Sequence, residues 1–309
     1  MNAVPAPGAH GGDAARLAKS LGLQPSLLLD LSASMNPFAP NVTAVIRELL
    51  QRDPGTIDRY PDPAEATTLL AAAIGVEAPR LVLTNGGAEA IALVAAQAPT
   101  GEVVEPEFSL YRRHLATVEA GGPRWRSNPS NPLGALADPD EIAAVWDEAF
   151  YPIATGSWTR GDDASWRLGS LTKLWNCPGL RLGYVIAPTA KEAALIRVSQ
   201  PQWAVNGVAL GVVPELLTHT DLVGWSTQIA KLRSDFALAL SDLGFIVRDT
   251  TVNWLLVEHP NLRSELIRHN IVVRDCNSFG LAGTYRVALP EPKDLDRVIA
   301  AFAATGQNQ

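Results

Sequence analysis

The spacing of apolar and polar residues predicts a chain of alternating helices and strands. In residues 12–23 apolar side chains recur every three or four positions, as on one face of a helix, whereas residues 27–31 form the short apolar run of a strand. Prolines exclude regular structure from residues 59–63. By the same criteria the N-terminal half contains helices at residues 41–52 and 64–75 and strands at residues 81–84, 103–104 and 142–146.

The C-terminal half predicts a strand at residues 184–186, a helix from residue 191, and mostly helical chain to residue 240. Strands and helices then alternate at residues 245–248, 254–258, 261–269, 271–274, 285–288 and 293–303. This alternation is typical of a small α/β domain. We therefore expect an N-terminal arm at residues 1–38 that packs with the small domain, a large domain at 39–210 and the small C-terminal domain at 211–309.

The chain between residues 110 and 147 is short for an α/β sheet. One helical stretch and a Gly-Gly-Pro break precede Asn131, and residues 132–147 leave room for a turn and one strand. A full strand–helix–strand crossover needs more chain than this second stretch supplies. The sequence therefore predicts a shortened large domain.

Composition excludes several classes of protein. The 309 residues are 47% hydrophobic and 18% charged, which is typical of a chain with a sizeable core. The net charge of -7 and the absence of a basic run argue against nucleic-acid binding. Two distant cysteines and five histidines without ligand spacing do not suggest a metal site. With neither a signal sequence nor an apolar run of membrane-spanning length, we expect a cytoplasmic protein.

One charged segment interrupts the apolar run at residues 168–188. It places Lys173 between hydroxyl residues and Arg181 on a turn bounded by glycines. A lysine that attacks an aldehyde must be partly desolvated so that its amine can lose a proton, and hydroxyls with a guanidinium suit a phosphate ester. Pyridoxal 5'-phosphate (PLP) combines both groups. The segment therefore predicts a PLP site, and the alternative is a surface loop with an unconnected Lys and Arg.

Two further positions support this prediction. Residues 85–87, Asn-Gly-Gly, join a strand to a helix, and such a turn directs backbone N–H groups at one point where an anion can bind. Asp147 follows a strand, where α/β sheets place ligand chemistry, and a carboxylate there can pair with a protonated pyridine nitrogen. Taken singly, a tight strand–helix connection explains the glycine turn equally well, and a helix cap or loop ion pair explains Asp147 better than a cofactor contact does.

These segments together resemble the aminotransferase class I/II family of PLP-dependent enzymes. The resemblance implies fold type I, an α/β fold with a large, mostly parallel-sheet domain and a small α/β C-terminal domain. A narrower similarity is to the threonine-phosphate decarboxylases of cobalamin biosynthesis, a subfamily related to histidinol-phosphate aminotransferases. It is carried by residues 10–12, 30–37, 59–62, 203–206, 274–276 and 285–288.

The resemblance implies a role for each cofactor residue. Lys173 would hold PLP as a Schiff base and later act as general acid and base, with Asp147 as the partner of the pyridine nitrogen. Tyr60 would reach the phosphate from the neighbouring subunit, which implies a homodimer. The full set of cofactor-binding residues is Tyr60, Gly87, Ala88, Phe108, Asn131, Asp147, Ser170, Thr172, Lys173 and Arg181. A role as a plain core residue remains the alternative for Phe108.

The resemblance also implies a substrate site. Arg286 would hold an α-carboxylate, for which a guanidinium has suitable bidentate geometry, and a salt bridge at a strand edge is the alternative for Arg274. Ser34 replaces an asparagine that contacts substrate in the decarboxylases, which leaves the substrate open. The residues implied in substrate binding are His10, Gly11, Ser34, Asn131, Arg274 and Arg286.

Phe150 bears on the reaction. Aminotransferases of the family usually carry a tyrosine at this position, whereas the decarboxylases share the phenylalanine. We therefore expect decarboxylation of O-phospho-L-threonine, with transamination of histidinol phosphate or an aromatic amino acid as the alternative. A third hypothesis is a PLP-binding or interaction protein that has lost catalysis. The joint presence of Lys173, Asp147, Arg181 and Arg286 argues against it.

Overall fold

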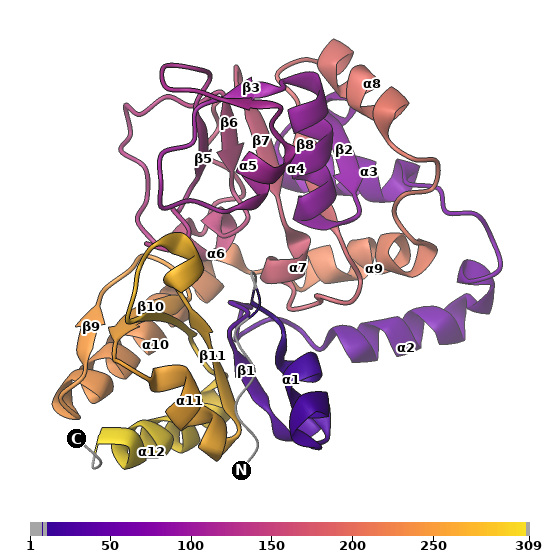
Figure 1. Cartoon of the computed structure of the whole chain (residues 1–309). Helices are drawn as coiled ribbons and strands as arrows, with labels where there is room; N and C mark the ends of the chain where they lie inside the picture. The colour runs from indigo at the N-terminus through magenta and orange to yellow at the C-terminus, as the bar shows by residue number, and fades with distance from the viewer. Residues whose placement is uncertain (1–7, 9–10, 307–309) are drawn as a thin grey trace. The chain divides into compact units, whose positions relative to one another are not determined.

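The computed structural model describes Gly8 and residues 11–306, which fold as two compact units (Figure 1). Unit 1 contains the described chain up to Phe38, Pro132–Ala135 and the chain from Thr227. Unit 2 contains Ala39–Asn131 and Leu136–Ser226. The chain passes from unit 2 to unit 1 within helix α10 (Leu222–Asp242), whereas the sequence places this division near residue 210.

The sheet of unit 2 has the strand order β2-β8-β7-β6-β5. Its strands are β2 (Leu81–Thr84), β5 (Trp125–Ser127), β6 (Val145–Asp147), β7 (Trp166–Gly169) and β8 (Gly183–Ile186). β5, β6 and β7 pair in parallel, and β8 is antiparallel to both β2 and β7. β8 is thus the one reversed strand of this sheet, and the predicted mostly parallel sheet is confirmed.

Helix α4 (Gly86–Gln97) crosses one face of this sheet (Figure 1). Its side chains Ile91 and Val94 share a buried cluster with Val82 of β2 and Leu168 of β7. Burial of such aliphatic side chains contributes about 1.5–3 kcal/mol each, so this cluster is a main source of stability. The other helices of unit 2 are α2 (Val42–Arg52), α3 (Ala64–Ile74), α5 (Leu110–His114), α6 (Tyr151–Thr155), α7 (Leu171–Leu174), α8 (Ala190–Ser199) and α9 (Gly207–Thr218).

The connection from β5 to β6 is a loop, as the short spacing predicts. Residues 128–144, all of them described, contain no helix. Arg160 holds this loop in place. Its guanidinium donates to the carbonyl oxygens of Asp138, Pro139 and Glu141 at 2.7–2.9 Å. The same guanidinium lies 4.6 Å from the ring centre of Trp146 in β6. One side chain therefore holds the loop and covers the sheet.

Unit 1 contains a sheet of order β1-β11-β12-β10-β9. Its strands are β1 (Leu29–Leu31), β9 (Ile246–Arg248), β10 (Trp254–Glu258), β11 (Ile271–Asp275) and β12 (Thr284–Ala288). β1 pairs in parallel with β11, so the N-terminal segment forms an edge of this sheet. Helix α1 (Ala14–Leu21) buries Leu17 and Ala18 against Ile267 and Val272. The other helices are α11 (Leu262–Leu266) and α12 (Leu295–Gly306).

Two strand predictions are wrong in position. Residues 103–104 are not a strand, since Val103 is buried but Val104 is 50% exposed, and the short strand there is β3 (Thr100–Gly101), paired with β4 (Thr117–Val118). The strand expected from residue 142 begins at Val145, and Ile142 is 84% exposed. In both cases the apolar run in the sequence extends into a loop whose apolar side chain is exposed. Short 3-10 helices lie at Pro25–Leu27, Pro54–Thr56, Ala78–Arg80, Ile267–His269, Asn277–Phe279 and Pro292–Asp294.

None of the helices in the described part of the chain combines the length and apolar character needed to cross a membrane. That part also holds no group of three or more His, Cys, Asp or Glu side chains placed to bind a metal ion.

Candidate active site

Sheet topology brings several of the predicted cofactor residues of unit 2 to one edge of the sheet. β2, β6 and β7 all end at this edge, and β8, which runs in the opposite direction, begins there. Gly86 follows β2, Asp147 ends β6, Ser170 follows β7, and Arg181 precedes β8. In Figure 1 the short helix α7, which carries Lys173, lies at this edge. Residues far apart in the sequence therefore meet because parallel strands end together.

The start of α4 and Arg181 form a site for an anion. Gly86 has φ +77°, and a side chain there would overlap the guanidinium of Arg181. A Cβ atom on Gly87 would lie 3.7 Å from the Cβ of Ser170. Within the described chain no carboxylate forms an ion pair with Arg181, whose Nη1 donates to the carbonyl of Pro178 at 3.3 Å. A helix start and a guanidinium thus combine without a carboxylate to neutralise them, which suits a phosphate.

Lys173 lies at the end of α7, and Thr172 anchors this turn to the sheet. The backbone N–H and the hydroxyl of Thr172 both donate to the carbonyl of Leu182, at 3.1 and 3.2 Å. Lys173 is half-buried, and its Nζ lies 5.8 Å from the ring centre of Phe150. The amine of Lys173 therefore lies over an aromatic ring and is partly desolvated.

Asp147 is held by two hydrogen bonds. Its Oδ2 accepts from the hydroxyl of Tyr111 at 2.8 Å, and its Oδ1 accepts from the backbone N–H of Ala149 at 3.0 Å. Burial raises the pKa of Asp147, while these two hydrogen bonds and the charge of Lys173 oppose the rise. A half-buried carboxylate in this state gains from a cationic partner, such as a protonated ring nitrogen.

Phe108 and Asn131, two more predicted cofactor residues, also belong to unit 2. The ring of Phe108 meets Tyr111 edge-on at 5.9 Å and packs on the core that α4 covers. Phe108 is therefore at least partly a core residue, as the alternative to a cofactor role predicts. Asn131 is buried, and its backbone N–H donates to the hydroxyl of Ser127 at 2.8 Å.

Sequence reasoning missed two residues at this edge, Tyr111 and Glu107. Tyr111 lies one helical turn after Phe108, which is a weak signal for a shared face. Glu107 is 5% exposed and contacts Ser127, which lies 20 residues further along the chain. No local pattern could have indicated this contact, because Glu107 lies in a loop and Ser127 ends a separate strand, β5.

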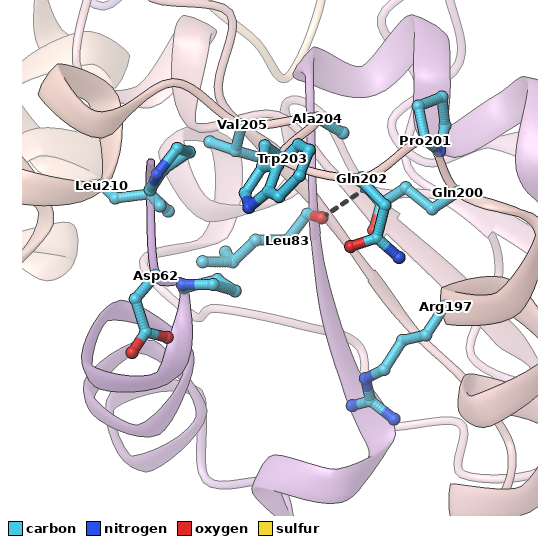
Figure 2. A pocket seen from close by; sticks show the side chains of 12 residues that line it. Asp62, Leu83, Arg197, Gln200, Pro201, Gln202, Trp203, Ala204, Val205 and Leu210 are labelled. Carbon is cyan, nitrogen blue, oxygen red and sulfur yellow. Dashed lines mark hydrogen bonds between the residues drawn. The ribbon is translucent and has the colours of Figure 1, made fainter. Parts of the chain in front are cut away.

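Tyr60 lies at the surface, 77% exposed, and stacks on Trp203 with ring centres 4.2 Å apart. Beside this pair is a pocket of about 270 Å³, with Asp62 and Arg197 on opposite sides (Figure 2). Of the described residues that line this pocket, none belongs to the predicted cofactor set. The reach of Tyr60 into a neighbouring subunit therefore stays a prediction.

Unit 1 holds the predicted substrate residues Gly11, Ser34, Arg274 and Arg286, whereas Asn131 belongs to unit 2. Arg274 of β11 and Arg286 of β12 lie directly opposite each other, and both are buried. Arg286 donates to the carbonyl of Ser32 at 3.1 Å and lies 5.1 Å from the ring centre of Trp254. Burial lowers the pKa of Arg286 to about 10. Two like charges across a strand pair repel, so the pair gains from anionic ligands.

The segment around Ser32 lines the same part of unit 1. Arg274 donates to the carbonyl of Gly8 at 2.7 Å and to the hydroxyl of Ser278 at 2.6 Å. A side chain at Gly11 would overlap the carbonyl of Ser32. No described residue shares a hydrogen bond with the hydroxyl of Ser34, which is buried. His10, also predicted to contact substrate, lies outside the described residues.

The fold and the residues of unit 2 together define a fold type I PLP-dependent enzyme. The model of the family "Aminotransferase class I and II" matches residues 125–302, more than half of the chain. The chain therefore belongs to this family, as the sequence motifs predict. The family is PLP-dependent, and the cofactor of this chain is PLP.

Two curated relatives match nearly the whole chain. Threonine-phosphate decarboxylase of Salmonella typhimurium is 28% identical, with 95% of each chain covered. Histidinol-phosphate aminotransferase 2 of Pseudomonas aeruginosa is 27% identical, with 93% of this chain and 91% of the relative covered. The chain is thus similar to both a decarboxylase and an aminotransferase.

A solved structure supports the fold. Histidinol-phosphate aminotransferase from Sinorhizobium meliloti, in complex with pyridoxal-5'-phosphate, superposes with a TM-score of 0.78. It is 15% identical, and the match covers 94% of each chain. At this identity the likeness concerns the fold, and it agrees with the predicted fold type I.

Proposed function

We propose that this chain is a decarboxylase of L-threonine O-3-phosphate that works in the cytoplasm as a homodimer. The observation that carries the proposal is the buried pair of Arg274 and Arg286, which face each other across β11 and β12. A small molecule with a carboxylate and a phosphate would neutralise both guanidinium groups. The 28% identity to a threonine-phosphate decarboxylase over 95% of the chain supports the same substrate.

PLP, when bound, supplies an aldehyde for the amino group and a ring that accepts electrons from the bond broken at Cα. We assign its phosphate to Gly87, Ala88, Ser170, Thr172 and Arg181, and its covalent attachment to Lys173. Asp147, held by Tyr111 and Ala149, would keep the proton on the pyridine nitrogen. Phe108 and Asn131 would hold the ring, and Tyr60 of the second subunit would complete the phosphate site.

Arg286 would hold the α-carboxylate and Arg274 the phosphate, with His10, Gly11, Ser34 and Asn131 around the substrate. The orientation in which Arg286 would hold the α-carboxylate would decide whether the bond to CO2 or the bond to the α-proton breaks. If CO2 leaves, Lys173 Nζ would donate a proton to Cα, and if the carboxylate stays, Lys173 would instead remove the α-proton.

The second candidate is an aminotransferase, which the 27% identity to histidinol-phosphate aminotransferase 2 supports. Phe150, whose ring centre lies 5.8 Å from Lys173 Nζ, supports decarboxylation, because the decarboxylases that the chain resembles share this phenylalanine. The amine of Lys173 is then the proton donor on that side.

The deciding experiment incubates PLP-loaded protein with O-phospho-L-threonine and no keto acid, and measures CO2 and the amine product. We expect CO2 and the amine to be released in equal amounts, and we expect neither to be released by the Lys173→Ala variant. Lys191→Ala, which changes a lysine exposed on α8, is the matched control and keeps the activity. Conversion of the cofactor to its pyridoxamine form without CO2 would refute decarboxylation and favour the aminotransferase.

A further inference from the structure

Glu107 is a buried carboxyl group that the proposed reaction does not use. Its Oε1 accepts from the backbone N–H of Ser127 at 3.0 Å. Its Oε2 accepts from the hydroxyl of Ser127 at 2.6 Å and from the backbone N–H of Phe108 at 3.1 Å. A carboxylate with three donors is well satisfied, so this arrangement is that of the ionised form.

The hydroxyl of Ser127 carries this contact further. It donates to Glu107 and accepts from the backbone N–H of Asn131 at 2.8 Å. The three residues therefore form a relay from Glu107 through Ser127 to Asn131, while Glu107 also holds Phe108 through its backbone. All four residues belong to unit 2, and we assign Phe108 and Asn131 to the cofactor ring.

We propose that Glu107 is a positioning residue for the cofactor ring, acting on Asn131 through Ser127 and on Phe108 directly. The inference rests on the proposed cofactor site. It adds a residue that makes no contact with cofactor or substrate itself.

Three titratable groups face Glu107 from neighbouring elements. They are Asp147 of β6, Tyr111 of α5 and Arg126 of β5. Burial raises the pKa of Glu107 to about 7, the hydrogen bonds from Ser127 and Phe108 oppose the rise, and Asp147 adds to it. Glu107 therefore changes charge near neutral pH.

Protonation of Glu107 would disturb the relay. A protonated Oε2 becomes a donor, and the oxygen nearest to it is the hydroxyl of Ser127. The hydrogen bond between the two residues then reverses, and the buried hydroxyl of Ser127 must find another acceptor for its proton. We therefore expect Asn131 and Phe108 to be held less firmly below pH 7 than above it.

The test measures PLP binding to the apoprotein by quenching of tryptophan fluorescence between pH 5.5 and 8.5. Wild type should bind PLP about tenfold more tightly above pH 7 than Glu107→Gln does, which corresponds to one charge-assisted hydrogen bond. At pH 5.5 the two proteins should bind PLP alike, because Glu107 is then neutral. Infrared spectra of the apoprotein should show a carboxylic-acid band that titrates near pH 7 and is reduced in Glu107→Gln.

Glu148→Gln is the matched control. Glu148 is also buried with its pKa raised to about 7, but its Oε1 accepts from the backbone N–H of Arg160 and not from Ser127. This variant should lose an infrared band yet keep the wild-type pH dependence of PLP binding. Ser127→Ala breaks the relay without removing the carboxyl group, and should flatten the pH dependence even where Glu107→Gln does not fold.

A pH step in Glu107→Gln equal to that of wild type would overturn the inference and leave the proposed function intact. The inference would also be overturned if Glu148→Gln changed the pH dependence of PLP binding in the same way as Glu107→Gln. Failure of the wild-type apoprotein to bind PLP at any pH would refute the cofactor site itself, and the inference with it.

Discussion

The hydroxyl of Tyr111 donates a 2.8 Å hydrogen bond to Oδ2 of Asp147, although the two residues are 36 positions apart. Tyr111 is fully buried, and burial together with the charge of Asp147 raises its pKa well above the usual value for tyrosine. The phenol therefore remains a donor at every working pH. It stabilises the ionised form of the carboxyl that we assign to the pyridine nitrogen.

Tyr111→Phe tests this relationship. The variant removes one donor from Asp147 and so raises the pKa of that carboxyl further, since burial is no longer opposed by this bond. We expect PLP affinity to fall about tenfold, in line with about 1.5–3 kcal/mol for a hydrogen bond to a charged group. Dialysis against PLP measures the loss. Unchanged affinity would mean that Asp147 does not hold the cofactor.

Lys173→Ala tests the attachment site. We expect the visible absorbance band of PLP-loaded protein to disappear and turnover to fall by at least 10²–10⁴-fold, the usual contribution of a general acid or base. The spectrum and the CO2 assay measure the two effects on the same sample. A retained band would place the attachment at another lysine.

Arg274→Met tests the substrate site. The change keeps a long side chain on β11 but removes the guanidinium that we assign to the substrate phosphate. We expect KM for O-phospho-L-threonine to rise about 30-fold, equivalent to about 2 kcal/mol. PLP affinity is the internal control and stays unchanged, because the cofactor residues lie in unit 2. An unaltered KM would assign the phosphate to other residues.

Glu148→Gln tests the cost of a buried carboxyl. The folded-state pKa of Glu148 is about 7, against 4.5 for an ordinary glutamate, because burial disfavours the charge. Between these pH values the folded chain keeps a proton that the unfolded chain has lost, so stability falls as pH rises. The full cost above pH 7 is roughly 3 kcal/mol.

Urea unfolding of wild type and Glu148→Gln at several pH values measures this cost. The variant should gain roughly 3 kcal/mol on wild type between pH 4.5 and pH 8, because a glutamine side chain does not titrate. Glu107 has a similar shift, but it is present in both proteins and cancels in the difference. A difference independent of pH would contradict the prediction.

Arg160→Ala tests the shortened crossover. The change removes three hydrogen bonds to the loop at residues 138–141 and the cation–π contact with Trp146. We expect the free energy of unfolding to fall by about 3 kcal/mol. Arg16→Ala, which changes an exposed arginine on α1, should cost less than about 1 kcal/mol. Equal losses would show that Arg160 does not secure the loop.

Apolar spacing predicts most helices and strands of this chain, and local motifs predict the residues of the candidate site. Apolar spacing predicts helices and strands because a helix or strand that buries one face repeats its apolar residues with its own structural period. Lys173, Asp147 and Arg181 are predicted site residues because each stands beside a local signal, which is an apolar run, a strand end or a glycine turn. Strand limits failed where an apolar run continues into a loop, as at Ile142 and Val104.

The side chains that support the candidate site become visible only in the folded chain. Tyr111 meets Asp147, and Glu107 meets Ser127, because separate strands and loops end at the same edge of the sheet. Arg160 donates a hydrogen bond to the carbonyl of Pro139 in the loop from β5 to β6, 21 residues earlier in the chain. Such contacts depend on the three-dimensional course of the backbone. Hydrogen bonds between distant segments have no period in sequence, so local patterns cannot predict them.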